Sequence, residues 1–350
     1  MIYYDTTKMG AARHRSGLMR VTSRLQQELG GLINAVRWDN AQRAFVQGKE
    51  RTPVKFAPRD WLLTVELFSD AERPGLAEFI AKHPCRLAAM FHDAIPLRWP
   101  HITWPQSVQR HPGYMKLLAG FDRVFAISEA SRRDLVGFWQ WQGVEPRAEV
   151  SLVELGADFD GGRRVQRDAR IARGRAALLC VGIVEPRKNQ SFLLEVAAEL
   201  WREGLDFDLH IVGRVNPHFG RPIVDKIRAL RKTESRLKLH EAASDAELAG
   251  LFAQLRAVVF PTIAEGCGLP LLEALWRGVP CVCSDLPVLR ENAEGGGCVV
   301  AKVNDLSDWQ VKLGAVLTDV ELNCRLQTEA MARPLTRWTD TAQTIKKALA

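Results

Sequence analysis

The amino-acid sequence predicts an α/β protein with two domains, each built on a parallel sheet with helices on both faces. Short apolar segments of strand length alternate with longer helical patterns throughout the 350 residues, and this alternation is typical of parallel sheets. The length is sufficient for two hydrophobic cores. The polar stretch at 157–173 has a Gly-Gly pair and few apolar residues, so we expect it to link the domains.

Strands are expected in both halves of the chain. In the first half they fall near Ile2–Asp5, Ile33–Trp38, Leu62–Leu67, Leu87–Phe91, Val124–Ile127 and Val150–Leu155. In the second half they fall near Ala177–Gly182, Asp208–Val212, Leu237–Leu239, Val258–Pro261, Val279–Cys283 and Gly297–Val300. Helices are expected at Leu18–Leu29, Ser191–Glu203, Ile223–Arg231, Ser244–Gln254 and Leu269–Arg277. Ligands of such sheets bind beyond the carboxyl ends of the strands, so the loops there are the first candidates for a site.

The composition is that of an ordinary globular protein, with 47% hydrophobic and 25% charged residues. No apolar run approaches the ~20 residues of a membrane span, and the start of the chain lacks the pattern of a signal peptide. The seven cysteines are scattered without zinc-site spacing. Cys281 and Cys283 share one side of an apolar strand, so we expect buried free thiols in a reducing cytoplasm.

The net charge is +7. Residues 1–165 hold 23 Lys and Arg against 18 Asp and Glu, so most of the surplus lies in the first half. This surplus favours anionic ligands or an anionic membrane surface. It is too diffuse to indicate nucleic acid, and no nucleic-acid motif accompanies it.

The segment Pro261–Pro280, PTIAEGCGLPLLEALWRGVP, is the most informative part of the sequence. It follows an expected strand, and its Gly266-Cys267-Gly268 turn leads into a helix. A glycine turn at a helix start leaves backbone N–H groups free and adds the positive end of the helix dipole. We therefore expect an anion site here, best suited to a phosphate or diphosphate, with Gly266, Gly268 and Leu269 beside the ligand.

Two glutamates flank this turn. Glu265 precedes it and Glu273 follows eight positions later, about two helical turns on and on a nearby face. A carboxylate accepts hydrogen bonds from two vicinal hydroxyls, so each glutamate could hold a sugar ring. A diphosphate between two polyols describes a sugar nucleotide. The alternative is a pair of glutamates on one solvated helix face.

This segment resembles the E-x7-E signature of retaining glycosyltransferase family 4, whose GT-B fold has two Rossmann-like domains facing an interdomain cleft. Further family-like segments follow the family order: HDAIP at His92–Pro96, AISEASRRDL at Ala126–Leu135, VGIVEPRKN at Val181–Asn189, IVGR at Ile211–Arg214 and SDLPVLRE at Ser284–Glu291. The resemblance spans most of the chain and is better in its C-terminal half.

The resemblance implies an acceptor-side domain at residues 1–160 and a nucleotide-sugar-binding domain at 174–335. It also implies that the last residues, 336–350, form a helix near Trp338–Leu349 that packs back on the first domain.

In the family, the Arg-Lys pair matched by Arg187 and Lys188 grips the donor diphosphate. Glu273 is expected to hold the ribose of the nucleotide, and Glu265 the hydroxyls of the donor sugar. Many members carry an arginine where this chain has Ile183, and Arg187 is the residue that could replace it. An ordinary basic loop is the alternative for the Arg-Lys pair.

Further candidates lie in the first half. The resemblance places His92 near the donor sugar and the acceptor, as a catalytic candidate; a structural histidine is the alternative. Asp93 could orient His92 or cap the following turn. Gly17 matches one glycine of a family loop that approaches the donor phosphates. Arg20 and Arg24 are expected on the exposed face of the first helix, where they could meet an anionic acceptor or solvent.

The segment His240–Ser244 occupies the usual place of the base-binding loop, so Ser244 is a candidate for donor binding. The base itself is left open. Cys267 stands where an aromatic residue is common, and we expect no catalytic role for it because no histidine partner is in view.

Two groups of aromatic residues have open roles. The tryptophans of the first domain are expected either at the core edge or in contact with an acceptor or a membrane surface: Trp99, Trp104, Trp139 and Trp141. Four histidines in polar segments are expected at the surface: His14, His101, His111 and His218.

Taken together, these features predict a cytoplasmic retaining glycosyltransferase that moves a hexose from a nucleoside diphosphate sugar to a hydroxyl of a growing glycan. GDP-mannose is the first choice of donor, because the HDAIP and EPRKN variants resemble bacterial surface-polysaccharide mannosyl and rhamnosyl transferases. A lipid-linked acceptor and peripheral contact with the inner membrane face are compatible with it. No DxD-type motif stands at a matching place, so we expect neither a metal nor another cofactor.

Three alternatives stay open. Two are other enzymes of this fold, a sugar-nucleotide 2-epimerase and a glycan phosphorylase, although phosphorylases need a pyridoxal lysine in a longer chain. The third is a non-catalytic, degenerate transferase subunit. The intact Arg187, Lys188, Glu265 and Glu273 argue against that reading.

Overall fold

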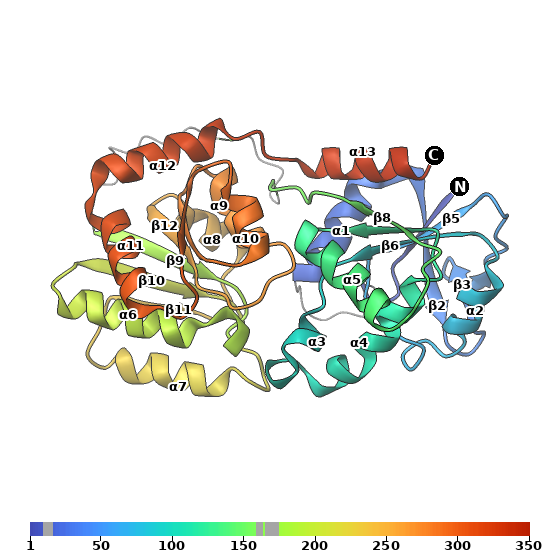
Figure 1. Cartoon of the computed structure of the whole chain (residues 1–350), viewed down its shortest axis with the longest axis horizontal. Coiled ribbons are helices and arrows are strands. Elements are labelled where there is room, and N and C mark those ends of the chain that lie inside the picture. The colour runs from blue at the N-terminus through green and yellow to red at the C-terminus, as the bar shows by residue number, and fades with distance from the viewer. Residues whose placement is uncertain (10–16, 159–163, 165–174) are drawn as a thin grey trace. The chain divides into compact units, whose positions relative to one another are not determined.

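A computed structural model describes residues 1–9, 17–158, 164 and 175–350 of the chain. The chain divides into two compact units (Figure 1). Unit 1 comprises Met1–Phe159 together with Thr336–Ala350, and unit 2 comprises Asp160–Leu335. The expected linker at 157–173 falls almost entirely outside the described residues.

The described strands of unit 1 form one sheet in the order β4-β3-β2-β1-β5-β6-β7-β8. Its strands are β1 (Ile2–Asp5), β2 (Ile33–Asp39), β3 (Ala44–Gln47), β4 (Thr52–Pro53), β5 (Trp61–Thr64), β6 (Arg86–Phe91), β7 (Arg123–Ala126) and β8 (Glu149–Leu152). Its helices are α1 (Gly17–Leu29), α2 (Leu76–Lys82), α3 (Ile95–Arg98), α4 (Pro105–Leu118), α5 (Glu129–Trp141) and α13 (Trp338–Ala348), with 3-10 turns η2 (Gly30–Leu32) and η3 (Pro100–Ile102). In this order, the six neighbouring strands β2, β1, β5, β6, β7 and β8 pair in parallel. The strands β3 and β4 add an antiparallel edge beside β2.

Unit 2 contains a second sheet, in which the described strands follow the order β11-β10-β9-β12-β13-β14 and are all parallel. Its strands are β9 (Ala176–Val181), β10 (Phe207–Val212), β11 (Leu237–His240), β12 (Leu255–Phe260), β13 (Cys281–Ser284) and β14 (Cys298–Ala301). Its helices are α6 (Gln190–Arg202), α7 (Arg221–Leu230), α8 (Asp245–Phe252), α9 (Leu269–Trp276), α10 (Pro287–Ala293), α11 (Leu306–Thr318) and α12 (Val320–Ala332), with the 3-10 turn η5 (Pro186–Lys188). The α/β architecture with parallel sheets, predicted from the strand–helix alternation, is thus confirmed.

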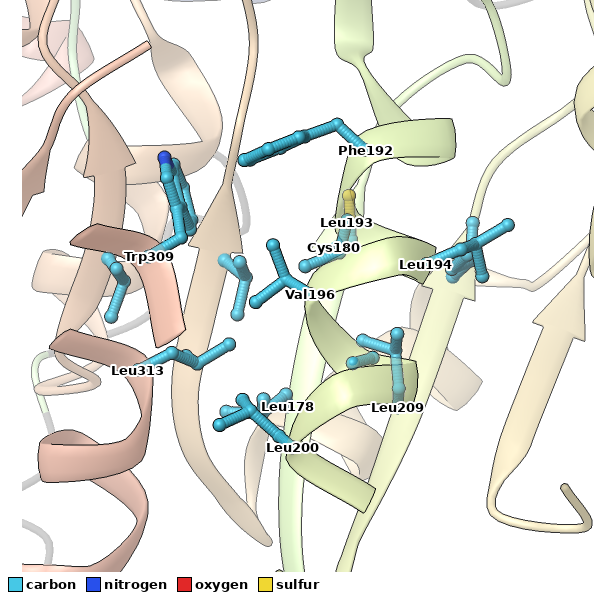
Figure 2. Packing of buried hydrophobic residues seen from close by; sticks show 14 of the residues in the cluster. Leu178, Cys180, Phe192, Leu193, Leu194, Val196, Leu200, Leu209, Trp309 and Leu313 are labelled. Carbon is cyan, nitrogen blue, oxygen red and sulfur yellow. The ribbon is translucent and has the colours of Figure 1, made fainter. Parts of the chain in front are cut away.

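One face of the unit 2 sheet packs on α6 and α11. Figure 2 shows Phe192 and Val196 of α6 pointing toward Trp309 and Leu313 of α11. The rings of Phe192 and Trp309 meet edge to face, with centroids 5.9 Å apart. Burying these apolar side chains stabilises the unit by about 25 cal/mol per Å2 of apolar surface removed from water. This packing fixes the sheet whose edge carries the candidate site.

The C-terminal helix α13 belongs to unit 1, where it packs against α1. The backbone N–H of Trp338 donates to Oδ1 of Asp158 over 2.8 Å, and the indole ring is fully buried. The hydroxyl of Thr341 donates to the carbonyl of Glu154 over 2.7 Å. The start of α13 is therefore attached to the segment that follows β8.

The structure corrects three expectations about unit 1. His111 is buried in α4 rather than exposed, because its Nε2 donates to the carbonyl of Asp93. Trp139 lies inside α5, buried, with its indole N–H on the carbonyl of Met115, whereas Trp141 is 78% exposed. The side chain of Arg24 is 15% exposed because it pairs with Glu28 of its own helix.

Two further observations concern membranes and thiols. Within the described part of the chain, no helix combines the length and the apolar character needed to cross a bilayer. Cys281 and Cys283 are buried free thiols, as the strand pattern predicted.

Candidate active site

The candidate site in unit 2 lies where the order of the strands reverses. The chain runs outward from β9 to β10 and β11, then returns to the other side of β9 to form β12 (Figure 1). In an open parallel sheet, this reversal leaves a crevice beyond the carboxyl ends of the two central strands. The loop after β9 carries Arg187 and Lys188, and the loop after β12 carries Glu265. Both predicted groups therefore share one edge of the sheet.

The loop after β9 is shaped by backbone conformations that few residues adopt. Gly182 has a φ of 147°, and a Cβ there would lie 3.2 Å from the side chain of Lys188. Asn189 ends the 3-10 turn in a left-handed conformation, with a φ of 57°. Its amide donates to the carbonyl of Pro261, at the end of β12, over 3.1 Å. These features hold the two loops together.

Glu265 is the centre of the polar contacts between these loops. Its Oε1 accepts hydrogen bonds from Nη1 of Arg187 at 2.8 Å, from the hydroxyl of Thr262 at 3.0 Å and from Nζ of Lys188. Lys188 also stands over the ring of Phe260, with its Nζ 4.8 Å from the ring centroid. The sequence assigned the two cations and the carboxylate to different parts of a ligand, whereas here they bind one another.

The charges in this cluster are mutually dependent. Burial raises the pKa of Glu265, but Lys188 and Arg187 outweigh it, so the pKa lies below its ordinary value. Burial is the largest influence on Lys188 and lowers its pKa, although Glu265 opposes the change. Because two cations face one carboxylate, we assign the ionised form to Glu265.

Sequence reasoning missed part of this arrangement. Glu185 accepts hydrogen bonds from Nε of Arg187 at 3.0 Å and from the amide of Asn216 at 2.9 Å. The Thr262 hydroxyl also lies 3.0 Å from the carbonyl of Arg187, which is an alternative acceptor for its single proton. Glu185 stands in the EPRKN segment, where an acid two residues before an arginine was the available signal. Asn216 gave none, because it reaches the site through the tertiary fold, whereas Thr262 contacts Glu265 from three positions earlier in the same loop.

The backbone donors of the glycine turn before α9 are confined to a short stretch. Gly268 has a φ of 84° and packs so tightly that a Cβ would lie 2.6 Å from Leu289. Leu271 and Leu272 already donate to the carbonyl of Gly268, and Pro270 has no N–H. The donors that this helix start can present to an anion are therefore limited to Leu269 and the residues before it.

Glu273 lies in the second half of α9 and is 3% exposed. That burial contradicts the alternative of a solvated helix face. Cys267 is also buried, and its carbonyl accepts a hydrogen bond from the amide of Asn292 in α10. The turn from Gly266 to Gly268 is thus fastened to the neighbouring helix.

Ser244 has a structural task in this fold. It is exposed and caps α8: its hydroxyl accepts from the N–H of Glu247, whose carboxylate accepts from the N–H of Ser244. The preceding His240 contacts His210 of the adjacent strand, with nitrogen atoms 3.0 Å apart. A donor-binding role for Ser244 stays a prediction.

In unit 1, His92 directly follows β6. Its Nε2 lies 2.8 Å from the carbonyl of Val65, which can accept but not donate, so the proton is on Nε2 and the lone pair on Nδ1. The hydroxyl of Ser131 donates to the carbonyl of His92 over 2.7 Å. Burial lowers the pKa of His92, although the Val65 carbonyl and Asp93 oppose the shift. The hydrogen bond to Val65 therefore fixes the orientation of the imidazole, and burial favours its neutral form.

The remaining candidates of unit 1 have simpler surroundings. Oδ1 of Asp93 accepts from the N–H of Ile95 over 3.0 Å, so of its two expected roles it performs the cap of the next turn. Gly17 is the exposed first residue of α1, and a Cβ there would meet no described atom within 4 Å. Arg20 is half-buried on the same helix. His14 lies outside the described residues.

Among the described residues, no group of three or more His, Cys, Asp or Glu side chains is placed to hold a metal ion.

Comparisons with known proteins bear on both the family and the fold. Residues 175–319 match the model of the family described as glycosyl transferases group 1. The serotype-specific mannosyltransferase WbdA of Escherichia coli is 32% identical over 259 residues, which are 69% of this chain and 31% of that protein. The O-antigen chain mannosyltransferase RfbU of Salmonella typhimurium is 29% identical over 133 residues, 38% of this chain and 36% of that protein. The chain thus spans about a third of the length of these curated relatives.

Solved structures resemble the chain over nearly its whole length. Sucrose-phosphate synthase of Thermosynechococcus elongatus aligns with a TM-score of 0.75 at 15% identity, covering 99% of this chain and 97% of that one. HepE of Anabaena, solved with UDP and glucose, aligns with a TM-score of 0.71 at 14% identity, covering 99% and 98%. These likenesses concern the fold. Residues 175–319 therefore match a glycosyl transferases group 1 domain, and the chain is similar in sequence to proteins described as mannosyltransferases and has the GT-B fold.

Proposed function

We propose that this protein is a retaining glycosyltransferase that moves a hexose from a nucleoside diphosphate sugar to a hydroxyl of a growing surface glycan. One observation carries the proposal. Arg187 and Lys188 meet Glu265 at the strand reversal of a group 1 domain. Two cations suit a diphosphate, and a carboxylate beside them suits the hydroxyls of the attached sugar.

The cluster suggests how the donor would bind. A donor diphosphate would compete with Glu265 for Lys188 and Arg187, because both cations now bind its carboxylate. All three hydrogen bonds to Glu265 end on Oε1, so we assign Oε2 to the donor sugar. Glu273 is assigned to the ribose, and Gly266, Gly268 and Leu269 to the phosphates.

The proposed chemistry uses no protein nucleophile. An oxygen of the departing diphosphate takes the proton of the acceptor hydroxyl, and the acceptor attacks the face that the diphosphate leaves. The C–O bond to the diphosphate breaks as the new glycosidic C–O bond forms. Arg187 and Lys188 offset the charge that grows on the leaving group. We assign His92 a role beside the sugar, where its Nδ1 can accept a hydrogen bond.

GDP-mannose is the donor that we propose first. Support comes from the relatives described as mannosyltransferases. HepE, in contrast, was solved with UDP and glucose, so donors with guanine and donors with uracil both belong in the test. We also propose, on the positive charge of residues 1–165 and the exposed rings of Trp104 and Trp141, a lipid-linked acceptor and peripheral contact with the cytoplasmic membrane face.

The test is a panel of nucleotide sugars that includes GDP-mannose, UDP-glucose, UDP-N-acetylglucosamine and dTDP-rhamnose. A transferase hydrolyses its own donor slowly and transfers the sugar faster when a glycan acceptor is added. A 2-epimerase would convert a nucleotide sugar to its epimer without an acceptor. A non-catalytic subunit would do neither, and that result with the whole panel would contradict the proposal.

A further inference from the structure

A cluster of three buried charges lies at the strand reversal of the unit 1 sheet. Nη1 of Arg73 donates to Oδ2 of Asp5 over 2.5 Å, and its Nη2 donates to Oε2 of Glu66 over 2.8 Å. The exposed fractions of the three side chains are 2% or less. Asp5 ends β1 and Glu66 follows β5, the two strands between which the sheet order reverses. The cluster therefore stands where an open parallel sheet binds its ligands.

Both carboxylates of this cluster bind the backbone that leaves β1. Oδ1 of Asp5 accepts from the N–H of Thr7 over 3.1 Å. Glu66 accepts from the N–H of Lys8 and from the N–H of Met9, each over 2.7 Å. Three consecutive amides are thus held by carboxylates rather than by a neighbouring strand. Residues 7–9 begin the connection from β1 to Gly17, the residue proposed to approach the donor phosphates.

Such a cluster is a costly way to stabilise a fold. It holds two acids and one base. Burial is the main cause that raises the pKa of Glu66, and the nearby carboxylate of Asp5 is the second. Apolar side chains of similar volume often stabilise a protein better than a buried ionic cluster does. The charges instead orient the backbone, because a carboxylate fixed by a guanidinium holds the N–H groups that it binds in one geometry.

We propose that Glu66 is a positioning residue for glycosyl transfer: fixed by Arg73, it holds the backbone of residues 7–9 and so sets the start of the connection that leads to Gly17. This inference rests on the proposed function, in which unit 1 supplies the acceptor side. Loss of Glu66 then impairs turnover much more than nucleotide affinity, because the nucleotide contacts proposed above are assigned to unit 2 apart from the approach of Gly17 to the phosphates.

The chain offers a matched control. Glu72 pairs with the same residue, Lys8, but through the ammonium group over 3.0 Å and not through the backbone. Glu72→Gln therefore removes a carboxylate next to the same segment while leaving the amides of residues 7–9 in place. Glu66→Gln offers one of those amides an NH2 group, which cannot accept its hydrogen bond.

The experiment compares wild type, Glu66→Gln, Glu66→Asp and Glu72→Gln in transfer kinetics, nucleotide calorimetry and amide hydrogen exchange. For Glu66→Gln we expect kcat to fall about 10- to 100-fold, with a much smaller change in the Kd for the nucleoside diphosphate and with faster exchange confined to residues 7–9. Glu66→Asp keeps the charge but not the reach, so it should show a smaller loss of the same kind. Glu72→Gln should match wild type.

Several results would overturn the inference. One is a folded Glu66→Gln variant with wild-type kcat, and another is a loss of kcat matched by an equal loss of nucleotide affinity. If that variant does not fold, Glu66→Asp is judged by the same two criteria. Hydrogen exchange in the wild-type protein is a further test. If the amides of Lys8 and Met9 exchange as fast as those of an exposed loop, Glu66 does not bind them and the inference is wrong. Failure of the proposed function looks different, since wild type would then transfer no sugar from any donor.

Discussion

Lys188 and Glu265 lie 77 positions apart in the chain and form a buried ion pair at the edge of the unit 2 sheet. Arg187 shares the same carboxylate oxygen. The cations proposed to bind the donor diphosphate are thus held in place by the acid proposed to bind the donor sugar. The pairing keeps both charges oriented, because an unpaired charge would be costly to bury at this depth.

Replacing Lys188 should therefore reduce turnover more than stability. For Lys188→Ala we expect kcat to fall by about 10²–10³, the range for removing one group that stabilises developing charge. Glu265 keeps Arg187 and Thr262, so the fold should persist. The matched control is Lys226→Ala, which breaks an exposed ion pair with Glu195 in the same unit. Steady-state kinetics at saturating donor measures the effect, and full kcat in Lys188→Ala would exclude the role.

Replacing Glu273 should weaken nucleotide binding. A hydrogen bond to a charged group is worth about 1.5–3 kcal/mol, so for Glu273→Gln and Glu273→Ala we expect the Kd of the nucleoside diphosphate to rise about 10- to 150-fold. Calorimetry measures the change, with Glu195→Ala on the exposed side of α6 as the control. Unchanged affinity in a folded variant would contradict the ribose assignment.

The titration of His92 gives a pH-dependent test. Burial holds the pKa of His92 below its ordinary value of 6.5, so folding favours the neutral ring. The stabilisation that this provides is complete above pH 6.5 and is lost as the pH falls through the lowered pKa. We expect NMR of histidine-labelled protein, assigned with His92→Gln, to show this ring titrating below 6.5. A pKa at or above 6.5 would show that the ring is not held neutral.

Activity should survive the removal of divalent metal ions. The expectation follows from the cations Arg187 and Lys188, which can offset the charge of the leaving diphosphate without a metal. Transfer is measured before and after dialysis against EDTA. If activity disappears and returns with Mg2+ or Mn2+, a metal shares the task that we assign to these side chains.

The product should keep the anomeric configuration of the donor sugar. The proposed attack occurs on the face that the diphosphate leaves, guided by one of its own oxygens. An inverting enzyme would instead need a general base on the opposite face. NMR of the anomeric proton in fresh product decides the question. A β-linked product from an α-linked donor would overturn the mechanism even if every donor contact proved correct.

The local pattern of apolar residues in the sequence predicted much of the fold. The expected strands coincide closely with β9, β10, β11 and β12. For the central strands β9 and β12 the reason is that a strand buried on both faces leaves an apolar run. The pattern also located the polar loops at the strand ends, including those with Arg187 and Glu265. The short antiparallel pair β3 and β4 was not predicted, and helices were expected between the strands without bounds for α4 and α5, since brief or mixed patterns have weak periodicity.

By itself the sequence determined which residue types gather at the carboxyl ends of the strands, because chain order and apolar spacing are local properties. Tertiary structure alone decided which of them bind one another. It joined Glu265 to both cations, buried Glu273 and His111, and brought Asp5, Glu66 and Arg73 together. The physical reason is that burial and the pairing of charges depend on strand order, and parallel strands bring distant segments side by side.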